Sequence, residues 1–127
     1  MITLYQAFNG DEEGEAYKLP IWGVMTSIGQ LLDGQITDND FIVHYSLNTL
    51  QQLQFAEAKN TIFNDITSVV TSLMMVGIDQ TNAVRVAHSV IGNEYQQTLI
   101  RAERGLIDES EFNSALGIQT TELPPLN

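Results

Sequence analysis

Apolar residues recur at three- and four-residue intervals along much of the chain, which is the spacing that gives an α-helix one buried face. The pattern is clearest over 61–76, and it recurs over 21–32 and from about 81 to 104. Pro20 precedes the 21–32 segment, where its fixed backbone angle suits the first turn of a helix. These three segments are therefore expected to be amphipathic helices.

Residues 38–58 carry a mixed pattern. The stretch FIVHYSL at 41–47 alternates between apolar and polar residues as a β-strand does. Leu47, Leu50 and Leu53, however, step in threes as they would on a helix. We favour a helix over the whole stretch because a strong start signal precedes it, and the strand alternative stays open for 41–47.

Glycine residues mark the ends of the expected helices. Gly34, Gly77 and Gly105 each follow an apolar segment, and Gly117 follows a short expected helix over 109–116. Glycine adopts the left-handed conformation that ends many helices without steric cost. The connections are then short, which favours antiparallel neighbours. The sequence predicts an all-α fold, a compact bundle of four to five helices joined by short connections that end in glycine.

Both ends of the chain lie outside this pattern. The segment ITLYQAF at 2–8 is apolar, and we expect a short strand or an extended arm there. An acidic loop over 9–16 completes an N-terminal segment of residues 1–16. The tail 118–127 contains two adjacent prolines, which favour extended polyproline geometry. We therefore expect one domain over 1–127, with extended N- and C-terminal arms that can dock on a neighbour.

A short phrase occurs twice, as GQITDNDF at 34–41 and as GLIDESEF at 105–112. Both copies resemble the second half of an EF-hand calcium loop, which has glycine at its sixth position and an acid at its twelfth. The EF-hand also needs oxygen ligands at its first and third positions. Those positions are occupied by Gly29, Leu31, Ile100 and Ala102. None of these side chains offers an oxygen, so we expect no calcium binding.

The repeated phrase is better explained as a junction between helices. Thr37 and Asp108 are predicted N-caps, whose side chains accept a backbone hydrogen bond at the start of the next helix. Three residues later, the side chain of Asp40 or Glu111 can accept a hydrogen bond from the backbone N–H of the cap residue. Glutamate is the more usual residue in this reciprocal role. An isoleucine before each cap and a phenylalanine five residues after it complete the pattern of a hydrophobic staple.

The chain is strongly acidic, with 16 acids against 5 bases and a net charge of −11. This balance opposes direct contact with nucleic acid or anionic lipid, because both require clustered Lys and Arg. The acids gather in two clusters, over 11–15 and 108–111. These clusters are compatible with an acidic inhibitor or nucleic-acid mimic that binds a basic groove on a partner, which we keep as an alternative function.

Candidate catalytic and metal-binding chemistry is sparse. The chain has no cysteine, which excludes disulfides, thiolate catalysis and cysteine-based metal sites. His44 and His88 lack the spacing of a metal or catalytic motif, and we interpret both as helix-edge residues. We expect no enzyme activity, no catalytic residue, and no cofactor or metal. No signal peptide or apolar run of membrane-spanning length is visible, so a cytoplasmic location is expected.

Residues 72–90 resemble a DNA-binding helix–turn–helix in their central turn. Recognition helices normally lie within a basic footprint, whereas Arg85 is the only Lys or Arg in this segment. A helix–turn–helix transcriptional regulator is therefore kept as a second alternative function. An antiparallel helix pair is the simpler structural expectation.

The polar face of the expected helix 61–76 is small and almost uncharged. A solvated helix face normally carries Lys, Glu or Arg, whereas small uncharged side chains let another helix approach closely. We predict that this face contacts another subunit; the alternatives are burial within the domain or simple exposure to water. The candidate interface residues are Asn64, Thr67, Ser68, Thr71, Ser72 and Met75.

Together these features favour a non-enzymatic interaction or assembly subunit that acts through helix-face packing and terminal arms. Its partner is expected to be a protein, either a second copy in a homo-oligomer or a larger complex. A structural component of a larger particle, such as a phage virion, is one setting that fits this profile.

Overall fold

The computed structural model describes residues 2–10 and 19–123, and all regular structure in these residues is helical. The helices are α1 (Leu4–Asn9), α2 (Ile21–Leu32), α3 (Asp38–Tyr45), α4 (Thr49–Met75), α5 (Gln80–Glu103) and α6 (Glu109–Leu116). The predicted all-α bundle is confirmed, and α1 adds a short helix to those expected. The acid cluster at 11–15 and the expected polyproline segment lie outside the described residues.

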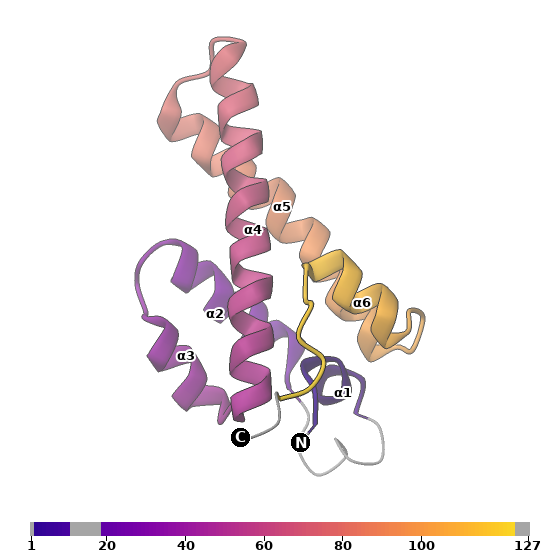
Figure 1. Ribbon diagram of the computed structural model, residues 1–127. Coiled ribbons are helices and arrows are strands. Elements are labelled where there is room, and N and C mark those ends of the chain that lie inside the picture. The colour runs from indigo at the N-terminus through magenta and orange to yellow at the C-terminus, as the bar shows by residue number, and fades with distance from the viewer. Residues whose placement is uncertain (1, 11–18, 124–127) are drawn as a thin grey trace.

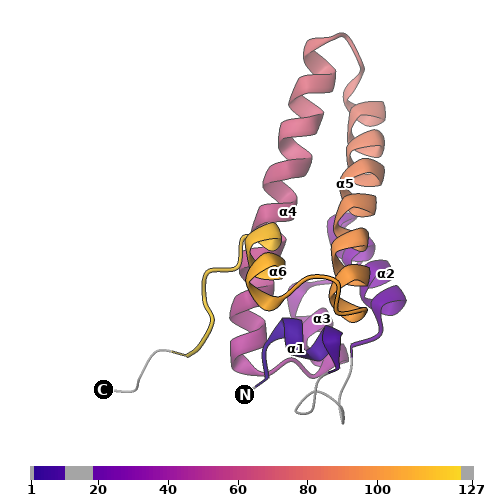
Figure 2. The same ribbon diagram turned by 90° about the vertical axis from the view of Figure 1, so that its right-hand side faces the viewer.

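The two longest helices, α4 and α5, form an antiparallel hairpin that extends well beyond the other helices (Figures 1 and 2). The helices α1, α2, α3 and α6 surround its lower part and form a base with it. Residues 66–86, which are the outer ends of α4 and α5 and the turn between them, are called the arm below. The molecule therefore consists of a packed base and a projecting two-helix arm.

The core lies in the base and brings together all six helices. Phe112 of α6 is fully buried, and its ring lies 5.4 Å from that of Tyr5 and 6.1 Å from that of Phe8. On the other side of the core, Phe41 of α3 stacks on Phe55 of α4 with ring centroids 4.4 Å apart. Aromatic contacts thus join the N-terminal helices to the hairpin and to α6.

The N-terminal segment is a helix and not the strand or extended arm that its sequence led us to expect. Thr3 caps α1 by accepting a hydrogen bond from the backbone N–H of Gln6, whose side chain returns a bond to Thr3. Leu4, Ala7 and Phe8 then fall on one buried face. Packing of this face stabilises a helix of 6 residues that would not be stable alone.

The expected helix 38–58 is also corrected, because the break falls at residues 46–48. Ser46 adopts a left-handed backbone with φ of 53° and ends α3. Asn48 then begins α4 by accepting a hydrogen bond from the N–H of Gln51, which bonds back to Asn48. From there α4 runs without interruption for 27 residues. The stretch that resembled a strand is therefore the end of one helix and the turn before the next.

Both copies of the repeated phrase are junctions between helices. Gly34 and Gly105 have φ of 74° and 69°, the left-handed backbone expected there. At Thr37 the reciprocal pair of bonds with Asp40 is complete, with N–O distances of 2.9 and 3.1 Å. Asp108 accepts a bond from the N–H of Glu111 at 2.8 Å, but no reciprocal bond forms. The expectation that the glutamate would be the better partner was wrong.

These caps support a stability prediction. Thr37→Ala and Asp108→Ala should each lower the free energy of unfolding by about 1 kcal/mol, the usual effect of losing an N-cap side chain. The neighbouring Asn39→Ala, at an exposed position within α3, is the matched control and should change stability by less than about 0.5 kcal/mol. Urea denaturation measures all three, and equal effects for the caps and the control would contradict the junctions as described.

The pKa of Asp40 adds a pH dependence to the first junction. The backbone N–H of Thr37 donates to the Asp40 carboxylate, and this bond, followed by the effect of the Thr37 side chain, lowers the pKa of Asp40. A lowered pKa in the folded state stabilises the protein above the unfolded-state pKa, and this contribution disappears as the pH falls. The Thr37 junction should therefore weaken in acid.

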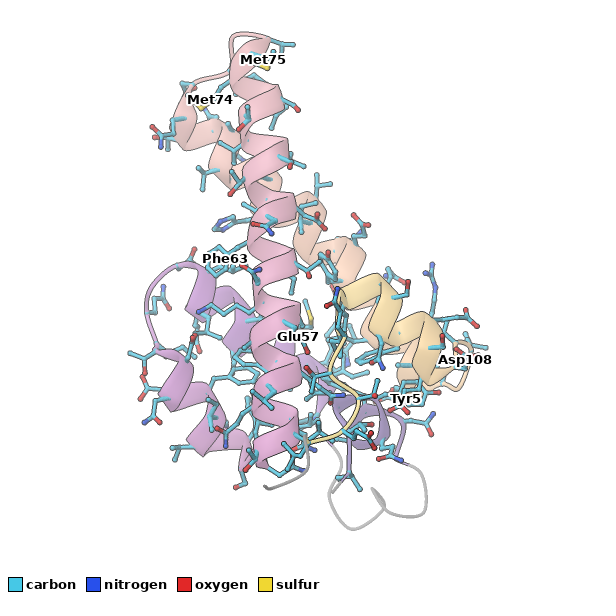
Figure 3. The ribbon with its side chains drawn as sticks, viewed as in Figure 1. Tyr5, Glu57, Phe63, Met74, Met75 and Asp108 are labelled. Carbon is cyan, nitrogen blue, oxygen red and sulfur yellow. The ribbon has the colours of Figure 1, made fainter. Side chains whose placement is uncertain are left out.

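The described part of the C-terminal tail is fastened to the base. Ile118 is buried, and the backbone N–H groups of Gln119 and Thr120 donate to the Glu57 carboxylate at 3.2 and 3.1 Å. The carbonyl of Thr120 accepts a bond from Gln54 at 2.9 Å. Figure 3 shows Glu57 on the side of α4 that the tail crosses. The tail after α6 thus lies along α4 as an extended strap.

Candidate interface on the helical hairpin

The small polar face of α4 is exposed along the arm. All six candidate interface residues are accessible to solvent: Asn64, Thr67, Ser68, Thr71, Ser72 and Met75. Burial of this face within the domain, one of the alternatives left by the sequence, is therefore excluded. The structure contains one chain, so contact with a further subunit remains a prediction.

The opposite side of the arm is where α4 meets α5. Ala83 and Ala87 are fully buried, and their small side chains let the two helices approach closely. Ala87 belongs to the same buried cluster as the isoleucines Ile62, Ile66 and Ile91. Within the arm, α4 and α5 are therefore held together by a narrow strip of buried apolar side chains, and the outer face of α4 stays exposed to solvent.

A polar contact fastens the two helices where the arm leaves the base. The hydroxyl of Tyr95 on α5 donates a short hydrogen bond to the Asp65 carboxylate on α4. Burial raises the pKa of Tyr95 above its ordinary value, and the bond to Asp65 raises it further. A group whose pKa is raised by folding contributes its full stabilisation at pH values below its unfolded-state pKa. This contribution is lost as the pH rises from the unfolded-state pKa through the folded-state pKa. This contact should thus hold the arm across the neutral range and weaken in strong alkali.

The tip of the arm carries large apolar side chains in solvent. Met74, Met75 and Val76 are 45%, 82% and 76% exposed. Figure 3 shows both methionines at the far end of the molecule, away from the base. Gly77 follows with φ of 97°, so the chain turns sharply and holds these side chains outward. Exposed apolar patches of this kind mark interaction sites more often than isolated exposed residues do.

The arm carries almost no charge although the whole chain is strongly acidic. Residues 66–86 contain one acid, Asp79, and one base, Arg85. The Asp79 carboxylate caps α5 through Asn82, and these bonds lower its pKa. Arg85 bonds to Asn82 on the same helix. Two copies of the chain would therefore meet little electrostatic repulsion at their arms.

A groove of about 640 Å³ lies between α2 and the middle of α5. Its apolar lining comes from α2 and includes Trp22, Met25, Ile28 and Leu32. At one end the Asp33 carboxylate lies 3.6 Å from Nδ1 of His88. Sequence reasoning missed this groove, because α2 and α5 are far apart along the chain and only the fold brings them together.

Two glycines widen the groove, and one tryptophan stands at its rim. Gly29 and Gly92 line opposite walls, and a Cβ added at either would meet no other atom within 4 Å. Trp22, the only tryptophan of the chain, is 68% exposed. A tryptophan outside the apolar spacing of the expected helix 21–32 was the one sequence signal that could have drawn attention to this surface.

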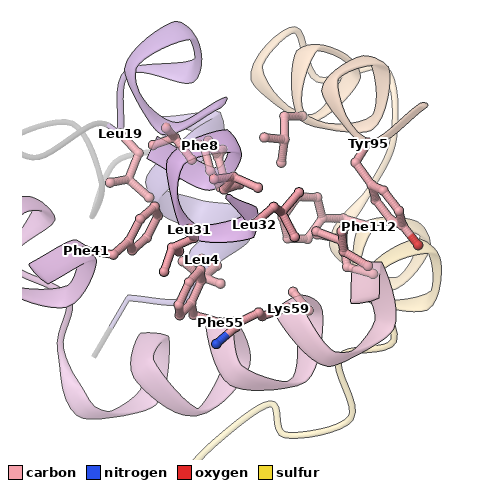
Figure 4. Close-up of a pocket in the computed structure, with 16 residues that line it drawn as sticks. Leu4, Phe8, Leu19, Leu31, Leu32, Phe41, Phe55, Lys59, Tyr95 and Phe112 are labelled. Carbon is pink, nitrogen blue, oxygen red and sulfur yellow. The ribbon is translucent and has the colours of Figure 1, made fainter. Parts of the chain in front are cut away.

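A small apolar cavity of about 50 Å³ lies inside the base. Figure 4 shows it surrounded by side chains from α1, α2, α3, α4, α5 and α6, with Lys59 at its edge. The Lys59 ammonium points away to the surface, where it binds both oxygens of Asp38 at 2.6 and 2.8 Å. The cavity has no cluster of polar groups around it and is best explained as imperfect core packing.

Partial filling of this cavity should stabilise the base. Val24 is buried and lines the cavity, so Val24→Ile places one more methylene in empty space. Burial of a methylene contributes about 0.8 kcal/mol, and we expect a gain of that order. The same substitution at exposed Val43 is the matched control and should have almost no effect. A denaturation midpoint that falls for Val24→Ile would show that the cavity cannot accept the added group.

The remaining candidate chemistry stays dispersed. Within residues 2–10 and 19–123, no three His, Asp or Glu side chains converge as metal ligands would. In the same residues no helix is both long and apolar enough to cross a membrane. His44 is exposed and packs edge-on against Tyr45, and His88 lies beside Asp33. The 72–90 segment is the tip of an antiparallel hairpin, whereas helix–turn–helix motifs cross their helices steeply.

Compared with known proteins, the chain matches no family model, no curated protein sequence and no solved structure.

Proposed function

We propose that this protein is a non-enzymatic assembly subunit that associates with further copies of itself through the projecting α4–α5 arm. The observation that carries the proposal is the exposed, nearly uncharged surface of the arm, which ends in Met74, Met75 and Val76. A two-helix arm with such a surface has no evident use in the folding of the base. Burial of that surface against a partner would remove it from water.

The partner is proposed to be a second copy because of the charge distribution. A net charge of −11 makes copies repel one another over most of the surface. This repulsion is weak at the arm, since its single acid and single base cancel. A basic partner would instead be attracted to the acid-rich base, which leaves the neutral arm suited to self-association.

The acidic-mimic alternative has less support from the described acids. Asp108 caps α6 through the N–H of Glu111, and Glu109 accepts a hydrogen bond from Thr3. Glu57 holds the C-terminal strap. These carboxylates have structural partners within the chain, so we favour the assembly subunit.

Thr71→Glu tests this proposal. It places a bulky charge in the middle of the exposed face of α4, where it should lower the mass measured by light scattering and leave the helical circular dichroism unchanged. Gln97→Glu adds the same charge at an exposed position of α5 in the base and is the control that should assemble normally. Assembly of Thr71→Glu at the concentrations at which the unmodified chain assembles would argue against a role for this face.

A further inference from the structure

We infer that the groove between α2 and α5 receives the tip of the arm from the next copy of the chain. This inference rests on the proposed self-association and names the surface that the arm binds. The tip of the arm presents a projecting apolar surface, formed by Met74, Met75 and Val76. The molecule also presents a groove of about 640 Å³ with an apolar wall from α2 and a largely polar wall from α5. A groove of this volume falls within the range of about 300–1,000 Å³ typical of binding sites.

The two surfaces are suited to each other in chemistry. Methionine side chains are flexible and polarizable, so they adapt to an irregular apolar groove and contact aromatic rings favourably. Trp22 offers such a ring at the rim, and tryptophan is prominent among residues that dominate binding energy. Gly29 and Gly92 leave space on the groove walls for side chains that this chain does not supply.

One charge on the arm is opposite in sign to a charge at the groove. The incoming arm carries one guanidinium, Arg85, and one carboxylate, Asp79. Helical side chains point toward the helix N-terminus, and Arg85 accordingly bonds to Asn82, which lies nearer the tip. The groove carries the Asp33 carboxylate, whose side chain is 56% exposed, next to the His88 imidazole. Arg85 of one copy can therefore pair with Asp33 of the next.

The tip cannot occupy the groove of its own chain. The α5 residues that line the groove run from His88 to Gln96, which places them about 12–24 Å along the helix axis from Gln80, the first residue of α5. A straight helix holds the tip at that distance. The contact therefore joins two copies through different surfaces, and such head-to-tail contacts build rings or filaments.

Complementation between two variants tests this arrangement. Met75→Glu damages the tip and keeps the groove, whereas Gly92→Phe fills the groove and keeps the tip. Each variant alone should remain at the monomer mass of 14.1 kDa. An equal mixture should double that mass, because the intact tip of one variant binds the intact groove of the other. The control Val43→Glu, at an exposed position on α3, should assemble as the unmodified chain does.

Fluorescence of Trp22 supplies a second measurement that needs no variant at the groove. As the only tryptophan, it reports on the groove directly, and its emission should shift to the blue as concentration rises and the tip covers it. The Met75→Glu variant should show no such shift.

The outcomes separate this inference from the proposed function. Assembly of Gly92→Phe, a mixture that stays monomeric, or assembly with unchanged Trp22 emission would overturn the groove as the receiving surface while self-association stands. An unmodified chain that never exceeds the monomer mass would overturn both. Circular dichroism tests whether each variant is folded. If Gly92→Phe does not fold, the Trp22 fluorescence of the unmodified chain and of Met75→Glu decides whether the groove receives the tip.

Discussion

Phe112→Ala should lower the free energy of unfolding by about 3–5 kcal/mol, the usual range for removing a fully buried phenylalanine. Phe112 is fully buried, and its ring contacts those of Tyr5 and Phe8 from the N-terminal helix. Its loss would therefore open a cavity at the point where α1 and α6 are held together. A loss of this size is a large part of the stability of a small domain.

Phe63→Ala is the matched control for this prediction. Phe63 lies on α4 and is 37% exposed, with the Lys59 ammonium 5.4 Å from its ring centroid. Its removal leaves no closed cavity and should cost much less. Urea denaturation of both variants makes the comparison, and similar losses for the two would show that Phe112 is not the centre of the core.

Gln54→Leu should cost about 1–3 kcal/mol, because it leaves the buried N–H of Leu4 without a partner and removes the bond to the partly buried carbonyl of Thr120. The Gln54 side chain is fully buried and joins three parts of the chain. Its oxygen accepts a bond from the N–H of Leu4, and its amide donates to the carbonyl of Thr120, both at 2.9 Å. Leucine has a similar size but can make neither bond.

Loss of these bonds should also loosen both ends of the chain. We expect faster amide hydrogen exchange at Leu4 and Thr120 in Gln54→Leu than in the unmodified protein, since these ends depend on Gln54 for their attachment to α4. Gln97→Leu, at an exposed position of α5, is the control for the added apolar surface and should leave stability and exchange nearly unchanged. Unchanged exchange at both ends in Gln54→Leu would contradict the role assigned to this side chain.

The sequence predicted the features that depend on local chemistry. The helical class, the left-handed glycines at 34, 77, 105 and 117 and the N-caps at Thr37 and Asp108 were all expected and are present. Each depends on residues within a few positions of one another. The exposed face of α4 was also identified correctly as small and polar, although the sequence left open whether it is buried.

The features that sequence reasoning missed depend on contacts between distant residues or on short signals. The helix α1 has only 6 residues, too few to show a clear period, and it is stabilised by packing on Phe112. The start of α4 had a local signal, Asn48 followed three residues later by Gln51, that the run of leucines obscured. Trp22 could at most draw attention to one wall of the groove, and the groove itself could not be predicted, since its walls are separated by more than fifty residues.

The central claim is that copies of this chain associate through the arm, and the mass of the unmodified protein as a function of concentration tests it most directly. Multi-angle light scattering should give a mass that rises above 14.1 kDa as concentration increases. The rise should persist in added salt, because the arm carries no net charge and salt screens mainly interactions between charges. A mass that stays at 14.1 kDa over the whole concentration range would contradict the account.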